Sequence, residues 1–293
     1  MGYLTYVWQK CFVSFIRVAF RLALGGTTPR PDEVLQIPRR DSTEGKIKVH
    51  VYRGKAPKPC PVLINFHGSG WTVPMHGSDE EFARCVVQGT DFTVLDATYR
   101  LAPEHPYPAA VHDAEDVVRW VLARPQEFDL SRVSISGFSA GGTLALVTSG
   151  EVFPKSTFRH LIAIYSPADF SRAPQTKKAP DPTGQPLPDW LATFFNNCYL
   201  PPGIDRKQPT VSPFFSRMEN VPDEIVIITC AGDNLCGEAE SVAQRLSDMP
   251  GKHVSLRRME KCNHAWDKST KPGSVQEQAK HAAYDLAIET LRR

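Results

Sequence analysis

Residues 136–142 read SGFSAGG and place a serine, Ser139, among glycines directly after an apolar run that predicts a strand. Such a loop of small residues is an ordinary strand-to-helix turn, a cradle for phosphate or a mount for a nucleophile. The run before it, RVSIS (132–136), is typical of a strand buried on both faces, and the run after it, GTLALVTSG (142–150), predicts the start of a helix. The rest of the chain decides between these interpretations.

The order of strands and helices predicts an α/β fold. Short apolar runs rich in Val and Ile predict buried strands at 61–66, 92–99, 132–137, 160–166 and 224–230. An alternating run at 45–54 predicts a strand exposed on one face, and helical spacing of apolar residues lies at 109–124, 237–249 and 274–293. Strands that alternate with helices predict a mostly parallel sheet covered on both faces.

The composition excludes several classes of protein. The 293 residues include 34 basic and 32 acidic side chains, a formal net charge of +2, without long like-charge blocks, so no nucleic-acid partner is expected. The seven cysteines are odd in number and show no C-x-x-C pairing, which argues against a disulfide framework and a zinc knuckle. We therefore expect reduced thiols, no metal site, a cytoplasmic protein and a small, largely neutral substrate.

The first residues predict an amphipathic helix and not a membrane span. Lys10, Arg17 and Arg21 interrupt the apolar stretch, and no clean cleavage site follows it. Residues at three- and four-residue steps predict one apolar face, made of Leu4, Trp8, Cys11, Phe12, Phe15, Ala19 and Phe20. This face either covers a pocket or lies on a bilayer surface, and the pattern favours the cover. Weak membrane-surface contact through this helix and a homodimer are the further partner predictions.

One segment breaks the alternation of strands and helices. Residues 170–215 are dense in proline and aromatic side chains but poor in periodicity, which in a compact domain is typical of a lid or a binding element. We expect this insertion and the N-terminal region, residues 1–45, to form a cap over a core made of 46–169 and 216–293. The cap aromatics favour an apolar pocket: Trp190, Phe194, Phe195, Phe214 and Phe215.

The serine turn matches the pattern G-x-S-x-G, in which small residues let the backbone turn sharply enough to expose the serine hydroxyl. The N–H of Ala140 then lies at a helix N-terminus, where the helix dipole favours a developing negative charge. A nucleophilic serine needs a base and a group that orients the base. Asp233 follows the predicted strand 224–230, and His264 lies in HVSLRRMEKCNHAW (253–266), in the loop after the last strand of the chain. Both residues therefore reach the sheet edge on which Ser139 lies. Their order along the chain is that of the α/β-hydrolases.

Other polar residues are weaker candidates for the base. His67 is the main competitor of His264, but it belongs to the motif HGSG (67–70), a small-residue loop that offers backbone N–H groups to an oxyanion or is a plain glycine turn. Asp113, Glu115 and Asp116 lie in a predicted helix and are interpreted as a solvent-exposed face with one cap.

Five motifs in order carry a family resemblance: HGSGW (67–71), YRLAPEHPYPAAVHDA (99–114), GFSAGG (137–142), AGDNL (231–235) and NHAW (263–266). From about residue 46 onward, the chain resembles the hormone-sensitive-lipase-like family of α/β-hydrolase esterases. The resemblance implies an eight-stranded, mostly parallel sheet, a cap from the N-terminus and an insertion after the sixth strand. It also implies hydrolysis of short- to medium-chain carboxylic esters without a cofactor. By this resemblance Ser139 is similar to the nucleophile, Asp233 to the acid and His264 to the base. The residues similar to the oxyanion donors are Ser69, Gly70 and Ala140.

The sequence departs from the family pattern at three positions. Ser69 replaces a glycine of the HGGG pattern, which adds a side chain and restricts φ. Phe138 replaces a polar residue and is expected to make the floor near the nucleophile more apolar, and Gly237 replaces an acidic residue, which puts a secondary hydrogen bond in doubt. Two other functions stay open: acyl transfer or lyase chemistry on the same three residues, and a non-catalytic receptor, which the presence of His264 disfavours.

Overall fold

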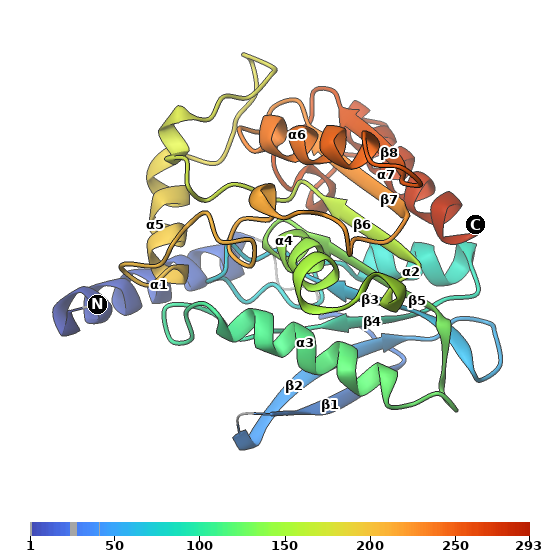
Figure 1. Cartoon of the computed structure of the whole chain (residues 1–293). Coiled ribbons are helices and arrows are strands. Elements are labelled where there is room, and N and C mark those ends of the chain that lie inside the picture. Colours follow the sequence, from blue (N-terminus) through green and yellow to red (C-terminus); the bar gives the residue numbers. More distant parts are fainter. Residues whose placement is uncertain (1, 24–27, 41) are drawn as a thin grey trace.

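The strands form one eight-stranded sheet in the computed structural model, which describes residues 2–23, 28–40 and 42–293 (Figure 1). The strands are β1 (Glu33–Arg39), β2 (Ser42–Tyr52), β3 (Cys60–Phe66), β4 (Thr93–Ala97), β5 (Phe128–Phe138), β6 (His160–Ile164), β7 (Glu224–Cys230) and β8 (His253–Met259). The α-helices are α1 (Tyr3–Ala23), α2 (Glu80–Gly89), α3 (Ala109–Leu122), α4 (Ala140–Val147), α5 (Asp189–Tyr199), α6 (Cys236–Ser247) and α7 (Val275–Leu291).

The sheet is mostly parallel, as predicted. Its order is β1-β2-β4-β3-β5-β6-β7-β8, with β1 and β2 antiparallel to their neighbours and the remaining pairs parallel. Every residue of β3, β4 and β6 is buried, which explains why these runs are largely apolar and do not alternate. The carboxyl ends of the parallel strands therefore meet along one edge of the sheet.

Helices cover both faces of the sheet, each over its own apolar core. Neighbouring residues of β3 point to opposite faces: Leu63 joins Phe82 of α2 and Tyr284 of α7, whereas Ile64 joins the core beneath α3, α4 and α6. In Figure 1, α3 and α4 lie in front of the sheet, and α2 lies behind it. These two apolar layers hold the sheet rigid under the loops at its carboxyl edge.

The sequence analysis missed β1, which lies inside the region 1–45 that we assigned to the cap. Its alternation is weak because this edge strand buries only Ile37. Pairing with β2 holds it, and so does an ion pair between Arg39 and Asp113 at 3.1 Å. The expectation of a solvent-exposed acidic face on α3 is wrong for this reason: Asp113 is fully buried, and Asp116 pairs with Arg40 at 2.6 Å.

The N-terminal helix α1 packs against α5, the helix of the 170–215 insertion. The Phe12 and Phe194 rings meet edge to face, with 4.9 Å between their centroids. The cap boundaries stay a prediction, and residues 1, 24–27 and 41 of the N-terminal region lie outside the described residues.

The predicted apolar face of α1 is right only in part, because Phe12 and Phe20 pack against the core. The buried positions are Gln9, Val13 and Ile16, whereas Leu4 and Phe15 of the predicted face are 82% and 68% exposed. Because α1 is apolar on nearly every side, the count of apolar residues could not select the face that packs. Arg17, one of the cations that interrupt the apolar stretch, reaches inward to an ion pair with Glu104 at 2.9 Å.

In the described part of the chain, no helix combines the length and the apolar character that a bilayer crossing requires. Weak membrane-surface contact and a homodimer stay predictions.

Candidate active site

The turn between β5 and α4 presents Ser139 at the carboxyl edge of the sheet. Ser139 has φ of 50° and ψ of −120°, a strained conformation that the tight packing around the turn holds in place. Gly141 shows how tight the packing is, because an added Cβ would lie 1.9 Å from the carbonyl oxygen of Phe66. Gly141 is therefore required by the close approach of the end of β3 to the turn, whereas an added Cβ on Gly137 or Gly142 would meet Gly141 or Ser166.

Ser139, His264 and Asp233 form one hydrogen-bonded line. The Ser139 hydroxyl lies 2.9 Å from Nε2 of His264, and Nδ1 of His264 lies 2.7 Å from Oδ2 of Asp233. Asp233 follows β7 and His264 follows β8, so the two strands bring together residues that are far apart in the sequence. The structure thus brings together the three residues that the sequence analysis singled out.

The surroundings of His264 favour its protonated form. Burial opposes the charge, but the nearby Asp233 carboxylate and its hydrogen bond outweigh burial, with a further contribution from Asp267, so the pKa of His264 is raised above 6.5. An imidazole with a raised pKa is a stronger base for the serine proton.

His67, the competing histidine, is placed differently. Its ring is fully buried and stacked on Tyr99, with 4.6 Å between centroids, and its Nδ1 lies 2.9 Å from the carbonyl oxygen of Gly68. Burial lowers the pKa of His67 to about 3, with His76 adding to the effect. His67 is therefore a neutral packing residue behind the loop 67–71.

The loop 67–71 curves beside Ser139, with Gly70 at a φ of +51°. An added Cβ on Gly70 would also lie 2.5 Å from the ring of Phe195. Within the described residues, the backbone N–H groups of Ser69, Gly70 and Ala140 donate no hydrogen bond to the rest of the chain. They stay available to a negatively charged oxygen.

The side chain of Ser69 turns away from the cavity and braces the loop. Its hydroxyl lies 2.7 Å from the hydroxyl of Tyr99 and accepts a 2.8 Å hydrogen bond from the N–H of Trp71. The Tyr99 hydroxyl donates in turn to the carbonyl oxygen of His67 at 2.7 Å. Compared with the glycine of the HGGG pattern, Ser69 restricts the backbone and adds hydrogen bonds that hold the loop 67–71 in place.

A cavity of about 50 Å³ lies in front of Ser139 and His264. Its lining is largely apolar and includes Trp71, Pro167, Phe170, Leu187, Phe195 and Leu235. Of the five cap aromatics predicted to favour an apolar pocket, Phe195 alone belongs to this lining within the described residues. Phe138 was expected at the cavity floor, and this is wrong: it is fully buried against Phe82, with 5.1 Å between ring centroids.

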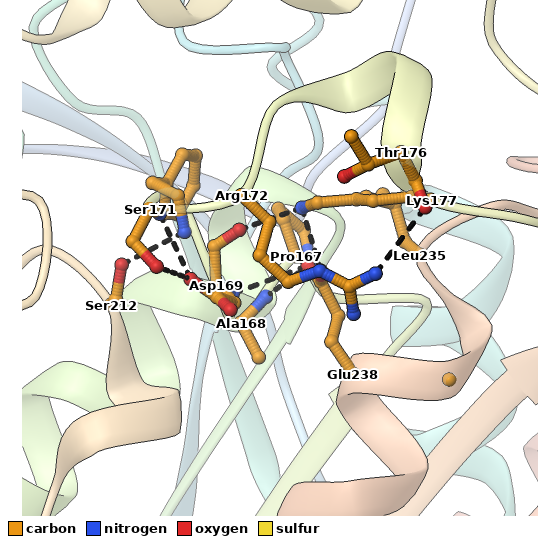
Figure 2. A network of polar contacts seen from close by, with 12 residues as sticks. Pro167, Ala168, Asp169, Ser171, Arg172, Thr176, Lys177, Ser212, Leu235 and Glu238 are labelled. Atoms are coloured by element: carbon orange, nitrogen blue, oxygen red, sulfur yellow. Dashed lines mark hydrogen bonds and ion pairs between the residues drawn. The ribbon is translucent and has the colours of Figure 1, made fainter.

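One cation, Lys177, also lines the cavity, and an acidic partner neutralises it. Its Nζ lies 2.6 Å from Oε2 of Glu238 and donates to the carbonyl oxygen of Asp169 at 2.7 Å. Glu238 also accepts hydrogen bonds from the N–H groups of Ala168 and Asp169, at 2.8 and 3.2 Å (Figure 2). The side chain of Glu238 thus ties α6 to the loop after β6, despite the glycine at position 237.

The sequence analysis missed Tyr99, Lys177 and Glu238. Tyr99 stands in the quoted motif YRLAPEHPYPAAVHDA, so its position in a family motif was the available signal. Lys177 lies in the irregular segment 170–215, where no periodicity points to a buried cation. Its ion pair joins residues 61 positions apart, and only the folded chain shows that pairing.

Comparison with known proteins agrees with this geometry. Residues 63–268 match a family model described as alpha/beta hydrolase fold. The esterase LipI of Mycobacterium tuberculosis is 38% identical over 115 residues, which cover 36% of this chain and 35% of the relative. The carboxylic ester hydrolase LipN of the same organism is 29% identical over 232 residues, or 76% of this chain and 61% of the relative. The chain therefore spans less than two thirds of the length of these relatives.

A solved structure extends the likeness along the whole fold. The hyperthermophilic esterase from the archaeon Pyrobaculum calidifontis is 26% identical to this chain, with a TM-score of 0.81. The match covers 96% of this chain and 93% of that one.

Proposed function

Because the chain belongs to the hormone-sensitive-lipase-like family of α/β-hydrolases, we propose that it is a serine carboxylesterase. The observation that carries this proposal is the hydrogen-bonded line of Ser139, His264 and Asp233 beside an apolar cavity. The similarity to esterases of Mycobacterium tuberculosis and Pyrobaculum calidifontis supports the same reaction.

The first half of the reaction forms an acyl-enzyme. Nε2 of His264 takes the proton of Ser139 while Oγ of Ser139 attacks the ester carbonyl carbon. Asp233 holds the imidazole in place and stabilises its positive charge. The N–H groups of Ser69, Gly70 and Ala140 bind the oxyanion, and the alcohol leaves with the proton that His264 returns to it. Water then attacks the acyl-enzyme by the same route and releases the acid.

The cavity favours small, largely neutral esters. Glu238 balances the charge of Lys177. This ion pair therefore adds no net charge to the apolar lining, and it would not attract a charged substrate. A volume of about 50 Å³ is well below the roughly 300–1,000 Å³ that is typical of pockets for drug-sized ligands. We therefore propose short acyl chains as the preferred substrates, at the lower end of the range that the family resemblance implies.

Two measurements test the reaction. Ser139→Ala is expected to lower the kcat for p-nitrophenyl acetate by at least about 10³-fold. Ser241→Ala, an exposed serine on α6, serves as the matched control and is expected to keep full activity. A fluorophosphonate should add its mass to the wild-type protein and to Ser241→Ala, but not to Ser139→Ala. Undiminished turnover by a folded Ser139→Ala would refute the assignment.

The acyl length is measured with p-nitrophenyl esters from C2 to C12. We expect kcat/KM to peak at C2 to C4 and to fall for longer chains. A peak at C8 or beyond would contradict the reading of the cavity but leave the nucleophile assignment intact. Product analysis with a competing alcohol separates hydrolysis from acyl transfer.

A further inference from the structure

A second cluster of polar side chains lies on the sheet face that carries α2, away from the Ser139 cavity. His50 of β2 and Asp96 of β4 are directly opposed in the antiparallel ladder between these strands. His76 comes from the loop between β3 and α2, and its ring stacks on His50 with 3.9 Å between centroids. One nitrogen or oxygen atom from each of the three side chains lies within 4.8 Å of the others.

Two of the three side chains carry a buried polar atom without a hydrogen-bond partner, whereas Nε2 of His76 lies 2.9 Å from the carbonyl oxygen of Asp96 and 3.5 Å from its Oδ2. His50 is 2% exposed and Asp96 fully buried, yet Nδ1 of His50 and Oδ2 of Asp96 make no hydrogen bond within the described residues. A buried polar atom without a partner is costly, and a metal ion would supply one.

The buried acidic groups around the cluster outnumber the buried cations. Lys268 lies 2.7 Å from Asp79 and 2.9 Å from Asp267, so one ammonium group serves two carboxylates. Asp96 is the third carboxylate, and the Asn65 amide joins it to Asp79 through hydrogen bonds of 2.9 Å each. Three carboxylates around one ammonium group make this interior acidic. A divalent cation at Asp96 would balance it, and the competing way to balance Asp96 is a proton.

We propose that His50, His76 and Asp96 bind a divalent transition-metal ion of the Zn²⁺ type. Two imidazoles and one carboxylate are a ligand set that zinc accepts, with a remaining position open to water or a backbone oxygen. Zinc bonds of about 2.0–2.2 Å place tetrahedral ligand atoms roughly 3.4 Å apart, so atoms at the 4.8 Å limit must approach one another by about 1.4 Å. His76 is the ligand that stands on a loop and not on a strand, and to bind the ion through Nε2 it must give up its 2.9 Å hydrogen bond to the carbonyl oxygen of Asp96.

The ion would have a structural role. It would join β2 and β4 to the loop that continues from the oxyanion loop, since the rings of His67 and His76 are 5.7 Å apart. It would not touch the substrate in the mechanism proposed above. The inference therefore stands or falls independently of the esterase assignment.

Equilibrium dialysis of chelator-treated protein against Zn²⁺ alone tests the proposal, with bound zinc measured by elemental analysis. We expect about one zinc ion per wild-type chain, and a Tm rise of about 4 °C when free Zn²⁺ is a hundredfold above Kd. Asp96→Asn and His76→Gln keep the size of each side chain, and each is expected to lower the affinity at least tenfold. His281→Gln, on an exposed position of α7, is the matched control and should bind zinc like wild type.

Circular dichroism and thermal unfolding without zinc establish that each variant is folded before its affinity is compared. Wild-type protein that binds no zinc would overturn the proposal and leave a proton as the partner of Asp96. Zinc that both variants retain at wild-type affinity would place the ion elsewhere, and would overturn it equally.

Discussion

The ion pair between Lys177 and Glu238 is expected to stabilise the wall of the Ser139 cavity through the coupling of two buried charges. The two side chains are 6% and 3% exposed, and each also bonds to the backbone of the loop after β6. Lys177→Met removes the cation and leaves the Glu238 carboxyl buried without it. Breaking a buried pair by removing one partner typically costs about 3–5 kcal/mol, so we expect a loss near 3 kcal/mol in the free energy of unfolding.

The double variant Lys177→Met/Glu238→Gln carries the stronger test. It removes both charges, while the glutamine oxygen still accepts the hydrogen bonds from the N–H groups of Ala168 and Asp169. Replacement of both partners of a buried pair is nearly neutral in many proteins, so the double variant is expected to lose only about 1–2 kcal/mol. The second single variant, Glu238→Gln, is also expected to lose about 3 kcal/mol. The two single losses then exceed the loss of the double variant by about 4–5 kcal/mol, which is the coupling energy of the pair.

Urea unfolding followed by tryptophan fluorescence measures these four free energies. The matched control is Lys178→Met, which removes the neighbouring, exposed lysine and should change the free energy of unfolding by less than about 0.5 kcal/mol. If the losses of the two single variants simply add in the double variant, the ion pair does not stabilise the cavity wall and the reasoning is refuted. Because Lys177→Met removes the contacts by which Lys177 holds the cavity wall to Glu238 and Asp169, KM for p-nitrophenyl acetate is expected to rise in this variant.

Two further predictions concern the reaction itself. Ser69→Ala removes the hydroxyl that holds the oxyanion loop through Tyr99 and the Trp71 N–H. In steady-state kinetics we expect kcat to fall about tenfold with little change in KM. A variant that keeps full kcat would contradict this role of the hydroxyl. The pH profile of kcat/KM reports the base: since His264 must be neutral to accept a proton and its pKa is raised, activity should increase with pH through a midpoint above 6.5. In Asp233→Asn this midpoint should move to lower pH and the rate should fall by about 10³–10⁴-fold, whereas an unmoved midpoint would assign the titration to another group.

Much of the site could be predicted because its residues stand at the ends of strongly patterned elements. The apolar runs before Ser139 and Asp233 mark strands buried on both faces, and the carboxyl ends of parallel strands share one edge. The prediction of eight strands came from the family resemblance alone, because β1 buries one residue and carries little pattern of its own. The placement of Phe138 failed for a related reason: β5 ends at this residue, and side chains alternate between the faces of a strand, so its ring went to the core beneath the sheet.

The amino-acid sequence by itself determined the alternation of strands and helices, the sharp turn at Ser139 and the order of the three residues that meet there. These are local properties, since periodicity, glycine content and turn chemistry act over a few neighbouring residues. Only the tertiary structure decided which face of α1 packs, that the buried Asp113 pairs with Arg39, and that Lys177 meets Glu238. Each of these is a pairing between distant segments, whose energy depends on desolvation and on partners that no local pattern specifies.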